Sequence, residues 1–199
     1  MNTEVAGIIA FVENFKNEIL MPLATAGILN AEIIQEAKQI FAQELEVKTR
    51  PVTLIRIEKD GKWGFFHPQN PCELTIDELV YGSVEHYRVA SSYFGSDQEF
   101  VDYIRESKTP AVAHRRGEAA DNAGKALRID YEATRDDELK KAYAAFLIKN
   151  PNHLKMLKES GDTTIHYAHS SDQYLGTTID GKGYNAIGKV LMALRKEFA

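Results

Sequence analysis

Apolar residues recur at steps of three and four positions through most of this chain, as they do on the buried face of a helix. The pattern is clearest near the C-terminus, where it consists of Ile187, Val190, Leu191, Leu194 and Phe198. The same spacing over residues 4–20 and 31–45 predicts two further helices, which we expect to form a helical hairpin.

The central part of the chain also predicts mostly helices. Helical spacing covers residues 83–95, 97–107, 131–149 and 151–160. Another helix is expected to begin at Thr109-Pro110, because proline suits the first turn, where the N–H groups have no partner within the helix.

Two regions carry the pattern of β-strands instead. Residues 52–58 and 63–66 are rich in β-branched and aromatic residues and flank Asp60-Gly61, which predicts a β-hairpin. A short strand is expected over residues 163–168. Together these patterns predict a mainly α fold with a small antiparallel β element, which is α+β by looser criteria.

Length and composition indicate one domain with an extension. With 199 residues and 44% apolar content, the chain is long enough for one well-buried core. We expect residues 1–50 to form an N-terminal helical extension and residues 51–199 to form the domain. The two apolar-faced helices of the extension favour an interaction element, with homo-oligomer formation through residues 1–48; the alternative is a simple extension of the core.

Charge and cysteine content narrow the partners and the compartment. A net charge of -5 argues against broad binding to nucleic acid or anionic membranes, although the local run His114-Arg-Arg116 is able to bind one phosphate. Cys72 is the only cysteine, which excludes an intrachain disulfide and fits the cytoplasm. The first apolar run is interrupted by Glu13 and Lys16, so we expect neither a signal peptide nor a membrane span.

A glycine-rich loop leads directly into the C-terminal helix and is the most informative feature of the sequence. Glycines in residues 174–183 permit backbone shapes that a side chain forbids, and Asn185 is a suitable helix cap. The free amides at the start of that helix attract phosphate or carboxylate groups. A dinucleotide-binding fingerprint is excluded, because the glycine spacing differs and no βαβ pattern surrounds it.

Two carboxylates are candidates for chemistry. Glu85 lies in the first turn of a helix that Ser83 is expected to cap, where an acid is often only a favourable partner of the helix dipole. Asp172 precedes the glycine loop, where an aspartate is usually a turn residue that accepts bonds from its own backbone. His166 and His169 point to opposite faces of an extended segment, so no metal or other cofactor is expected.

Four short motifs resemble the NADAR superfamily, and the resemblance extends over about residues 52–198. The most specific is Gly181-Lys-Gly-Tyr-Asn-Ala-Ile-Gly188, followed by Ser83-Val-Glu-His-Tyr87. Asp172-Gln-Tyr-Leu-Gly176 and Leu127-Arg-Ile-Asp-Tyr-Glu132 match less closely. The resemblance implies a compact single NADAR-like domain.

The resemblance also implies roles for individual residues. Glu85 is the catalytic carboxylate, and Asp172 is the second carboxylate candidate. The implied substrate-binding residues are His86, Arg128, Tyr131, Tyr174, Gly176, Lys182, Gly183 and Asn185. Without the resemblance, His86 reads as a satisfied buried histidine and Arg128 as half of a surface salt bridge.

Several positions depart from the family pattern. Polar or charged residues that the family usually carries are replaced at His67, Val89, Ser92, Glu118 and Tyr167. The usual tryptophan after the Asp-x-Tyr motif is Leu175. These departures affect the identity of the substrate more than the fold, because the apolar helix patterns are intact.

The resemblance implies an N-glycosidase that hydrolyses the bond between a ribose anomeric carbon and nitrogen. The expected partner is a small phosphorylated ribosylamine or an ADP-ribosylated substrate of the guanine type, which includes an ADP-ribosylated nucleic-acid base. The alternative is a noncatalytic module that binds ADP-ribose or a related nucleotide.

Overall fold

The computed structural model describes residues 14, 17–18, 21–25, 35, 39, 54–169, 171–178 and 181–198. The chain divides into two compact units, residues 1–52 and 53–199. In the first unit, helix α2 (Met21–Thr25) is described, and most of the predicted helices over residues 4–20 and 31–45 lies outside the described residues. The second unit contains all of the candidate site residues.

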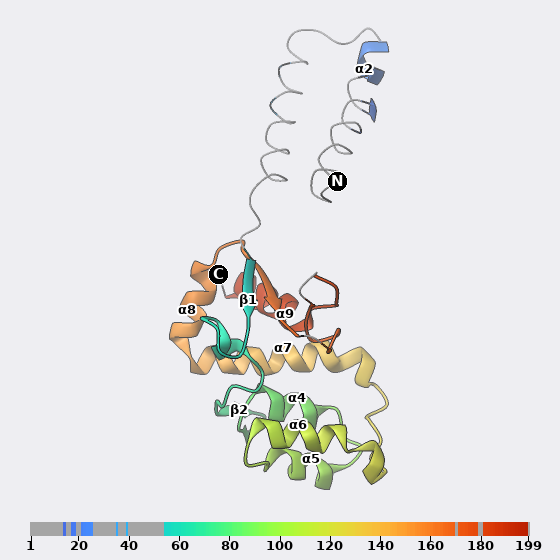
Figure 1. Cartoon of the computed structure of the whole chain (residues 1–199), viewed down its shortest axis with the longest axis vertical. Coiled ribbons are helices and arrows are strands. Elements are labelled where there is room, and N and C mark those ends of the chain that lie inside the picture. Colours follow the sequence, from blue (N-terminus) through green and yellow to red (C-terminus); the bar gives the residue numbers. More distant parts are fainter. Residues whose placement is uncertain are drawn as a thin grey trace. The chain divides into compact units, whose positions relative to one another are not determined.

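The second unit is built around the long helix α7 (Tyr131–Lys149), which crosses its middle (Figure 1). On one side α4 (Val84–Ser91) packs against α7, and α5 (Gln98–Arg105) and α6 (Pro110–Glu118) pack against α4. On the other side lie α8 (Pro151–Glu159) and α9 (Ala186–Glu197). A 3-10 turn, η3 (Asp121–Ala123), follows α6.

The β-structure consists of two small sheets. Strand β1 (Leu54–Ile57) pairs in parallel with β4 (Thr164–Tyr167), and α9 packs against β4. Strands β2 (Leu74–Ile76) and β3 (Leu79–Tyr81) form an antiparallel hairpin. Its two-residue turn, Asp77-Glu78, has positive φ at both positions (49° and 66°), as the right-handed twist of a tight hairpin requires. A small antiparallel β element is therefore present, as the predicted fold class requires, but at residues 74–81.

The hairpin predicted across Asp60-Gly61 is wrong. After β1 the chain turns into a 3-10 helix, η2 (Gly64–Phe66), and β1 takes β4 as its partner. The aromatic residues that suggested a second strand are used for packing, with Phe66 buried and Trp63 and Phe65 against the core. Gly64 fits here because a Cβ would collide with the backbone carbonyl of Lys59.

Helix starts follow the sequence closely. The side chains of Ser83, Asp97 and Thr109 each accept a hydrogen bond from the backbone N–H three residues later, as N-caps do. Pro110 occupies the first turn of α6, as predicted. The predicted boundaries 131–149 agree with α7.

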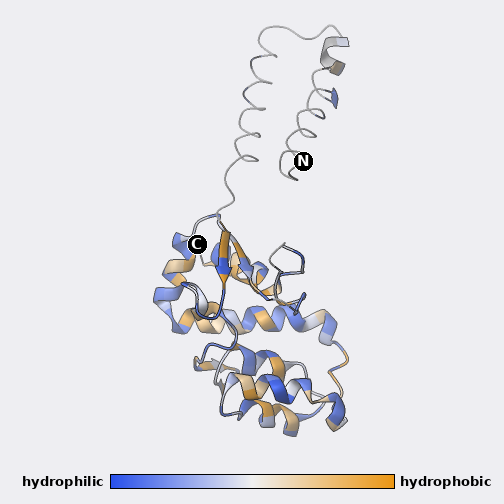
Figure 2. Ribbon diagram, viewed as in Figure 1, coloured by the Kyte–Doolittle hydropathy of each residue, from blue (hydrophilic) through white to orange (hydrophobic). Residues whose placement is uncertain are grey.

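The hydrophobic core lies where α7 meets α4, α9 and β2 and where α9 meets β4. Figure 2 shows apolar and polar residues interleaved along these elements. The predicted face of the C-terminal helix is confirmed, since Ile187, Val190, Leu191 and Leu194 are buried. Among the described residues, no helix has the length and apolar character needed to cross a bilayer.

Candidate active site

Glu85 occupies the second position of α4 and is 2% exposed. Its Oε2 accepts a hydrogen bond from Arg88 Nε at 3.0 Å, and its Oε1 accepts one from Arg88 Nη2 at 2.7 Å. His114 of α6 donates from Nδ1 to Oε1 at 2.7 Å. The carboxylate is thus held from its own helix by a bidentate arginine and from a second helix by a histidine.

These contacts keep Glu85 ionised. Burial alone would raise the pKa of its carboxyl, but the Arg88 charge and the hydrogen bonds from His114 and Arg88 lower it to about 2. In return, the hydrogen bond to Glu85 raises the pKa of His114, against the smaller effect of burial. The group therefore combines a buried negative charge with a cationic arginine and with a histidine whose protonated form that charge favours.

His86 holds the start of α4 in place. It is 2% exposed; Ser83 Oγ lies 2.7 Å from its Nδ1, and the Ser107 carbonyl lies 3.0 Å from its Nε2. The same Ser83 Oγ accepts the backbone N–H of His86, so the cap and the histidine form one unit. Because both ring nitrogens have partners within the protein, this residue is placed to position Glu85 rather than to contact a ligand.

A cleft of about 230 Å³ opens beside the partners of Glu85. It is lined by Arg88, Val89, Ser92, Tyr93, His114, Gly117, Glu118, Leu127 and Tyr131. Tyr131 stands at the start of α7 and also lines a smaller neighbouring hollow with Arg88 and Tyr174. The cleft thus joins charged groups to aromatic surface, a combination suited to a sugar and a base.

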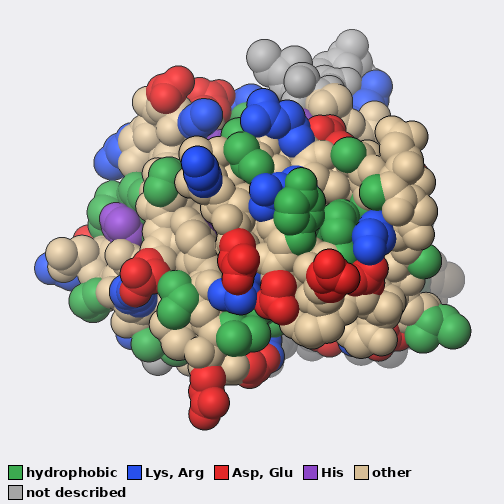
Figure 3. All heavy atoms as spheres, turned by 90° about the horizontal axis from the view of Figure 1, so that it is seen from below, with side chains coloured by type: hydrophobic (Ala, Val, Ile, Leu, Met, Phe, Trp, Pro, Cys, Tyr) green, Lys and Arg blue, Asp and Glu red, His purple; other side chains and the backbone are tan. Residues whose placement is uncertain are grey.

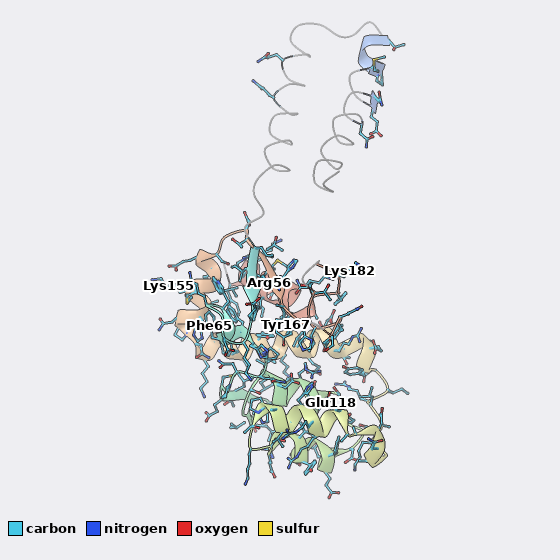
Figure 4. All side chains as sticks on the ribbon, viewed as in Figure 1. Arg56, Phe65, Glu118, Lys155, Tyr167 and Lys182 are labelled. Atoms are coloured by element: carbon cyan, nitrogen blue, oxygen red, sulfur yellow. The ribbon has the colours of Figure 1, made fainter. Side chains whose placement is uncertain are left out.

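Three positions that depart from the family pattern meet in this cleft. Ser92 and Glu118 are two of these departures, and both line the cleft. Val89 packs so closely on Gly117 that a Cβ there would overlap the valine side chain. Figure 4 labels Glu118 on α6.

Tyr167 on β4 and His67 in the segment after η2 both lie close enough to Glu85 for its charge to affect their pKa values. Tyr167 Oη lies 3.1 Å from His67 Nε2, and His67 Nδ1 accepts the backbone N–H of Gln69. Burial raises the pKa of Tyr167, and the nearby charges of Glu85 and Asp172 raise it further. Tyr167 therefore lies within electrostatic range of both candidate carboxylates; Figure 4 labels it near β1.

Asp172 makes the turn that its sequence position suggests. Its Oδ1 accepts the backbone N–H groups of Tyr174 at 3.0 Å and Leu175 at 2.8 Å. Burial lowers the pKa of Arg88, whereas the charge and hydrogen bond of Glu85 raise it, and the charge of Asp172 makes a smaller contribution in the same direction. The side chain therefore supports the loop and remains within electrostatic range of the Glu85 group.

The glycine loop is fitted closely against β4. A Cβ on Gly176 would come within 2.6 Å of the Tyr167 carbonyl oxygen, and one on Gly183, where φ is 133°, would overlap the Gly176 carbonyl. These two glycines therefore permit close backbone approach. None of these contacts bears on the substrate-binding role that the resemblance implies for Gly176 and Gly183.

Asn185 does not cap α9 through its side chain, so that prediction is wrong. The residue has a left-handed backbone (φ 59°), and its side chain reaches β4 instead. Its Oδ1 accepts the N–H of Tyr167 at 3.0 Å, and its Nδ2 donates to the Ile165 carbonyl at 2.8 Å. This position joins the loop, the strand and the helix.

The other implied binding residues have partners within the chain. Tyr174 donates its hydroxyl to Asp136 and stacks on Tyr184, with ring centroids 5.6 Å apart. Arg128 binds Asp130 and, at 3.1 Å, Glu138, which matches the alternative reading of this residue as a salt bridge. Lys182 is exposed, and its carbonyl accepts the Thr178 N–H at 2.9 Å.

Sequence reasoning missed the two partners of Glu85. Arg88 had a usable signal, since a cation three residues after an acid lies on the same helix face. His114 had none, because a separation of 29 residues says nothing about contact until α4 and α6 are packed together. The basic run around it does not form one patch: Arg116 donates to the Tyr103 carbonyl and to Ser107.

The surface carries mixed charge. On the face shown in Figure 3, acidic and basic side chains of the described residues are interspersed. Within the described part of the chain, no group of three His, Cys, Asp or Glu side chains is arranged to hold a metal ion.

Residues 57–199 match the NADAR domain family, so the chain belongs to that family. A relative named N-glycosidase YbiA, from Shigella boydii, is 28% identical over 126 residues, which cover 63% of this chain and 76% of that protein. A Nostoc punctiforme protein, also named an N-glycosidase, is 25% identical over 136 residues, which cover 68% of this chain and 85% of the length of that protein.

A longer plant protein matches as well. The chloroplastic riboflavin biosynthesis protein PYRR of Zea mays is 29% identical over 177 residues, or 83% of this chain, and the chain spans 28% of that protein. The NMR structure of Escherichia coli YbiA superposes with a TM-score of 0.67 at 24% identity. The match covers 75% of this chain and 87% of the YbiA chain. The predicted mainly α, NADAR-like fold is confirmed.

Proposed function

We propose that this protein is an N-glycosidase that hydrolyses a ribose C1′–N bond, with Glu85 as the main catalytic carboxylate. The observation that carries the proposal is a buried carboxylate that Arg88 and His114 keep ionised beside a cleft. The names of the Shigella and Nostoc relatives support the same class of reaction.

The chemistry fits an ionised carboxylate. Breaking a C1′–N bond develops positive charge on the sugar, in an oxocarbenium-like transition state. A fixed negative charge in a water-poor site stabilises that charge without reorganising during the reaction. Tyr131 offers an aromatic face for the base or the sugar, and Asp172 remains the candidate for the second carboxylate.

The substrate class that we propose is a phosphorylated ribosylamine or an ADP-ribosylated compound of the guanine type, acted on in the cytoplasm. The Zea mays relative, a riboflavin biosynthesis protein, supports the first of these. Lys182 and the start of α9 are the proposed phosphate contacts, with Tyr174 and the glycine loop beside them.

The second candidate is a noncatalytic module that binds ADP-ribose or a related nucleotide. Two observations favour it: Arg128 is committed to Asp130 and Glu138, and Asp172 accepts two backbone N–H groups of its own loop. Both residues are thereby less available to a substrate than the family resemblance implies.

The deciding experiment is a turnover assay on wild type and on Glu85→Gln. ADP-ribosylated guanosine, a ribosylamine pyrimidine intermediate and NAD are each incubated with the protein, and sugar release is followed by mass spectrometry. Glu99→Gln is the matched control, because Glu99 also holds the second position of a capped helix but is exposed. Release that Glu85→Gln abolishes and the control retains supports the enzyme; calorimetric binding without release supports the module.

The N-terminal unit is proposed as a separate element for self-association, formed by residues 1–50. Deleting residues 1–48 tests this. A smaller number of subunits in the oligomer supports the proposal, whereas an unchanged number of subunits and an unchanged melting temperature contradict it.

A further inference from the structure

The proposed reaction needs a proton donor for the departing nitrogen, and His114 is the group with the geometry for that task. One ring nitrogen, Nδ1, is fixed on Glu85 Oε1 at 2.7 Å, deep in the protein. The ring is 37% exposed and lines the cleft that Arg88 and Tyr131 also border. A histidine anchored on a buried carboxylate at one nitrogen and open to a cleft at the other is arranged for proton transfer.

The second ring nitrogen faces a group that a ligand can replace. Nε2 lies 3.3 Å from Glu118 Oε1, and the Glu118 side chain is 65% exposed. An exposed ion pair of this kind contributes little stability, because water and salt screen it. A substrate nitrogen entering the cleft can therefore take the place of Glu118 at Nε2.

The surroundings of the ring favour its charged form. Glu85 on α4 and Glu118 on the same helix as the ring raise the pKa of His114, whereas the charge of Arg88 on α4 lowers it. The hydrogen bond from Nδ1 to Glu85 outweighs burial and raises the pKa of His114. On α5, which also packs against α6, Arg105 is paired with Asp102.

Other titratable groups around Glu85 fit the task less well. His86 is buried with both ring nitrogens bonded. Burial lowers the pKa of His67, whose Nδ1 accepts a backbone N–H. Burial raises the pKa of Tyr167, and Asp172 supports the backbone of its loop.

We propose that His114 is the catalytic acid of this site, and this inference rests on the N-glycosidase function proposed above. As the C1′–N bond breaks, its electron pair moves to the nitrogen, which takes the proton from His114 Nε2. Water then adds to the oxocarbenium carbon and returns a proton to Nε2, so the ring ends as it began. Glu85 stays ionised, holds the ring through Nδ1 and stabilises the sugar cation.

The test is the pH profile of turnover in the full-length protein, on whichever N-riboside the wild type cleaves. His114→Asn is the main variant, because its side-chain N–H can still donate to Glu85 in place of Nδ1. We expect kcat to fall by about 10²- to 10⁴-fold, the range for loss of a general acid, with KM nearly unchanged. The loss of wild-type activity at high pH, set by deprotonation of His114, disappears in this variant.

Glu118→Gln provides an intermediate case. It keeps the imidazole and removes one of the two carboxylates that face it, so the high-pH loss of activity should move to lower pH. Thermal melting of both variants checks that they are folded.

The outcomes separate this inference from the function on which it rests. A wild type that cleaves none of the N-ribosides overturns both. A wild type that cleaves one, with His114→Asn retaining kcat within about tenfold or keeping the wild-type loss at high pH, overturns the role of His114 alone.

Discussion

Glu85→Gln should destabilise the folded protein as well as affect the proposed chemistry. The substitution keeps the size of the side chain and removes its charge, which leaves the Arg88 guanidinium without a counter-ion in a mostly buried position. The pKa of Glu85 lies at about 2 instead of 4.5. At about 1.4 kcal/mol per pKa unit this corresponds to a contribution of about 3 kcal/mol, similar to the loss measured when one partner of a buried pair is removed.

The pH dependence of this loss follows from the direction of the shift. Because the folded-state pKa of Glu85 lies below the unfolded-state value, its stabilisation is present above about pH 4.5 and fades as the pH falls towards 2. Urea unfolding of wild type and Glu85→Gln at pH 7, 5 and 3 should therefore show a full difference at pH 7 and a smaller one at pH 3. The exposed Glu99→Gln control should change stability by less than about 0.5 kcal/mol.

Two results would refute this reasoning. One is a difference below about 1 kcal/mol at pH 7, which would place the pair among surface salt bridges. The other is a difference that does not narrow between pH 7 and pH 3. Combining Glu85→Gln with Arg88→Met adds a check: since the second change removes the orphaned charge, the double variant should be more stable than the sum of the single effects indicates.

Three further predictions concern the frame around the site, and thermal or urea unfolding checks each. Gly183→Ala should cost more than about 2 kcal/mol because of overlap with a loop carbonyl, whereas Gly181→Ala, with positive φ but open space, should cost about 1 kcal/mol; equal losses would contradict the overlap. Ser83→Ala removes a cap and the partner of a buried histidine, so it should cost about 2–3 kcal/mol against about 1 for Thr109→Ala, and matching losses would speak against the shared role. Tyr143→Phe removes a buried hydroxyl that donates to a carbonyl at 2.7 Å and should cost about 1 kcal/mol; no measurable change would show that the bond has no net value.

Local signals in the sequence predicted the helices well. The caps Ser83 and Thr109, the proline after Thr109 and the apolar spacing of residues 187–194 all act within one or two turns. Their outcome therefore depends little on the rest of the fold.

Strand pairing was harder to predict because it depends on distant segments. The Asp60-Gly61 signal is a valid turn signal, yet β1 pairs with β4, more than a hundred residues later. The true hairpin turns at Asp77-Glu78, and its local signal was weak because glutamate stands where such a turn usually has glycine.

The candidate site shows the same difference between local signals and contacts made by distant segments. Glu85 was accessible through a motif, whereas its contact with His114 exists only after two helices pack. Asn185 shows the opposite error: the local cap preference was sound, but the strand offered its side chain a backbone N–H and a carbonyl together. Tertiary contacts outweighed local preference there.

The Asn185 bridge also has a consequence for protein engineering. It fixes the downstream end of the glycine loop to β4, and the upstream end is fixed by the backbone bond from His169 to the Thr177 carbonyl. Because both ends of the loop are anchored, we expect substitutions there to leave the neighbouring strand and helix in place. The exposed positions that flank the loop, Gln173 and Tyr184, can be randomised to search for new substrates while the register of strand and helix stays unchanged.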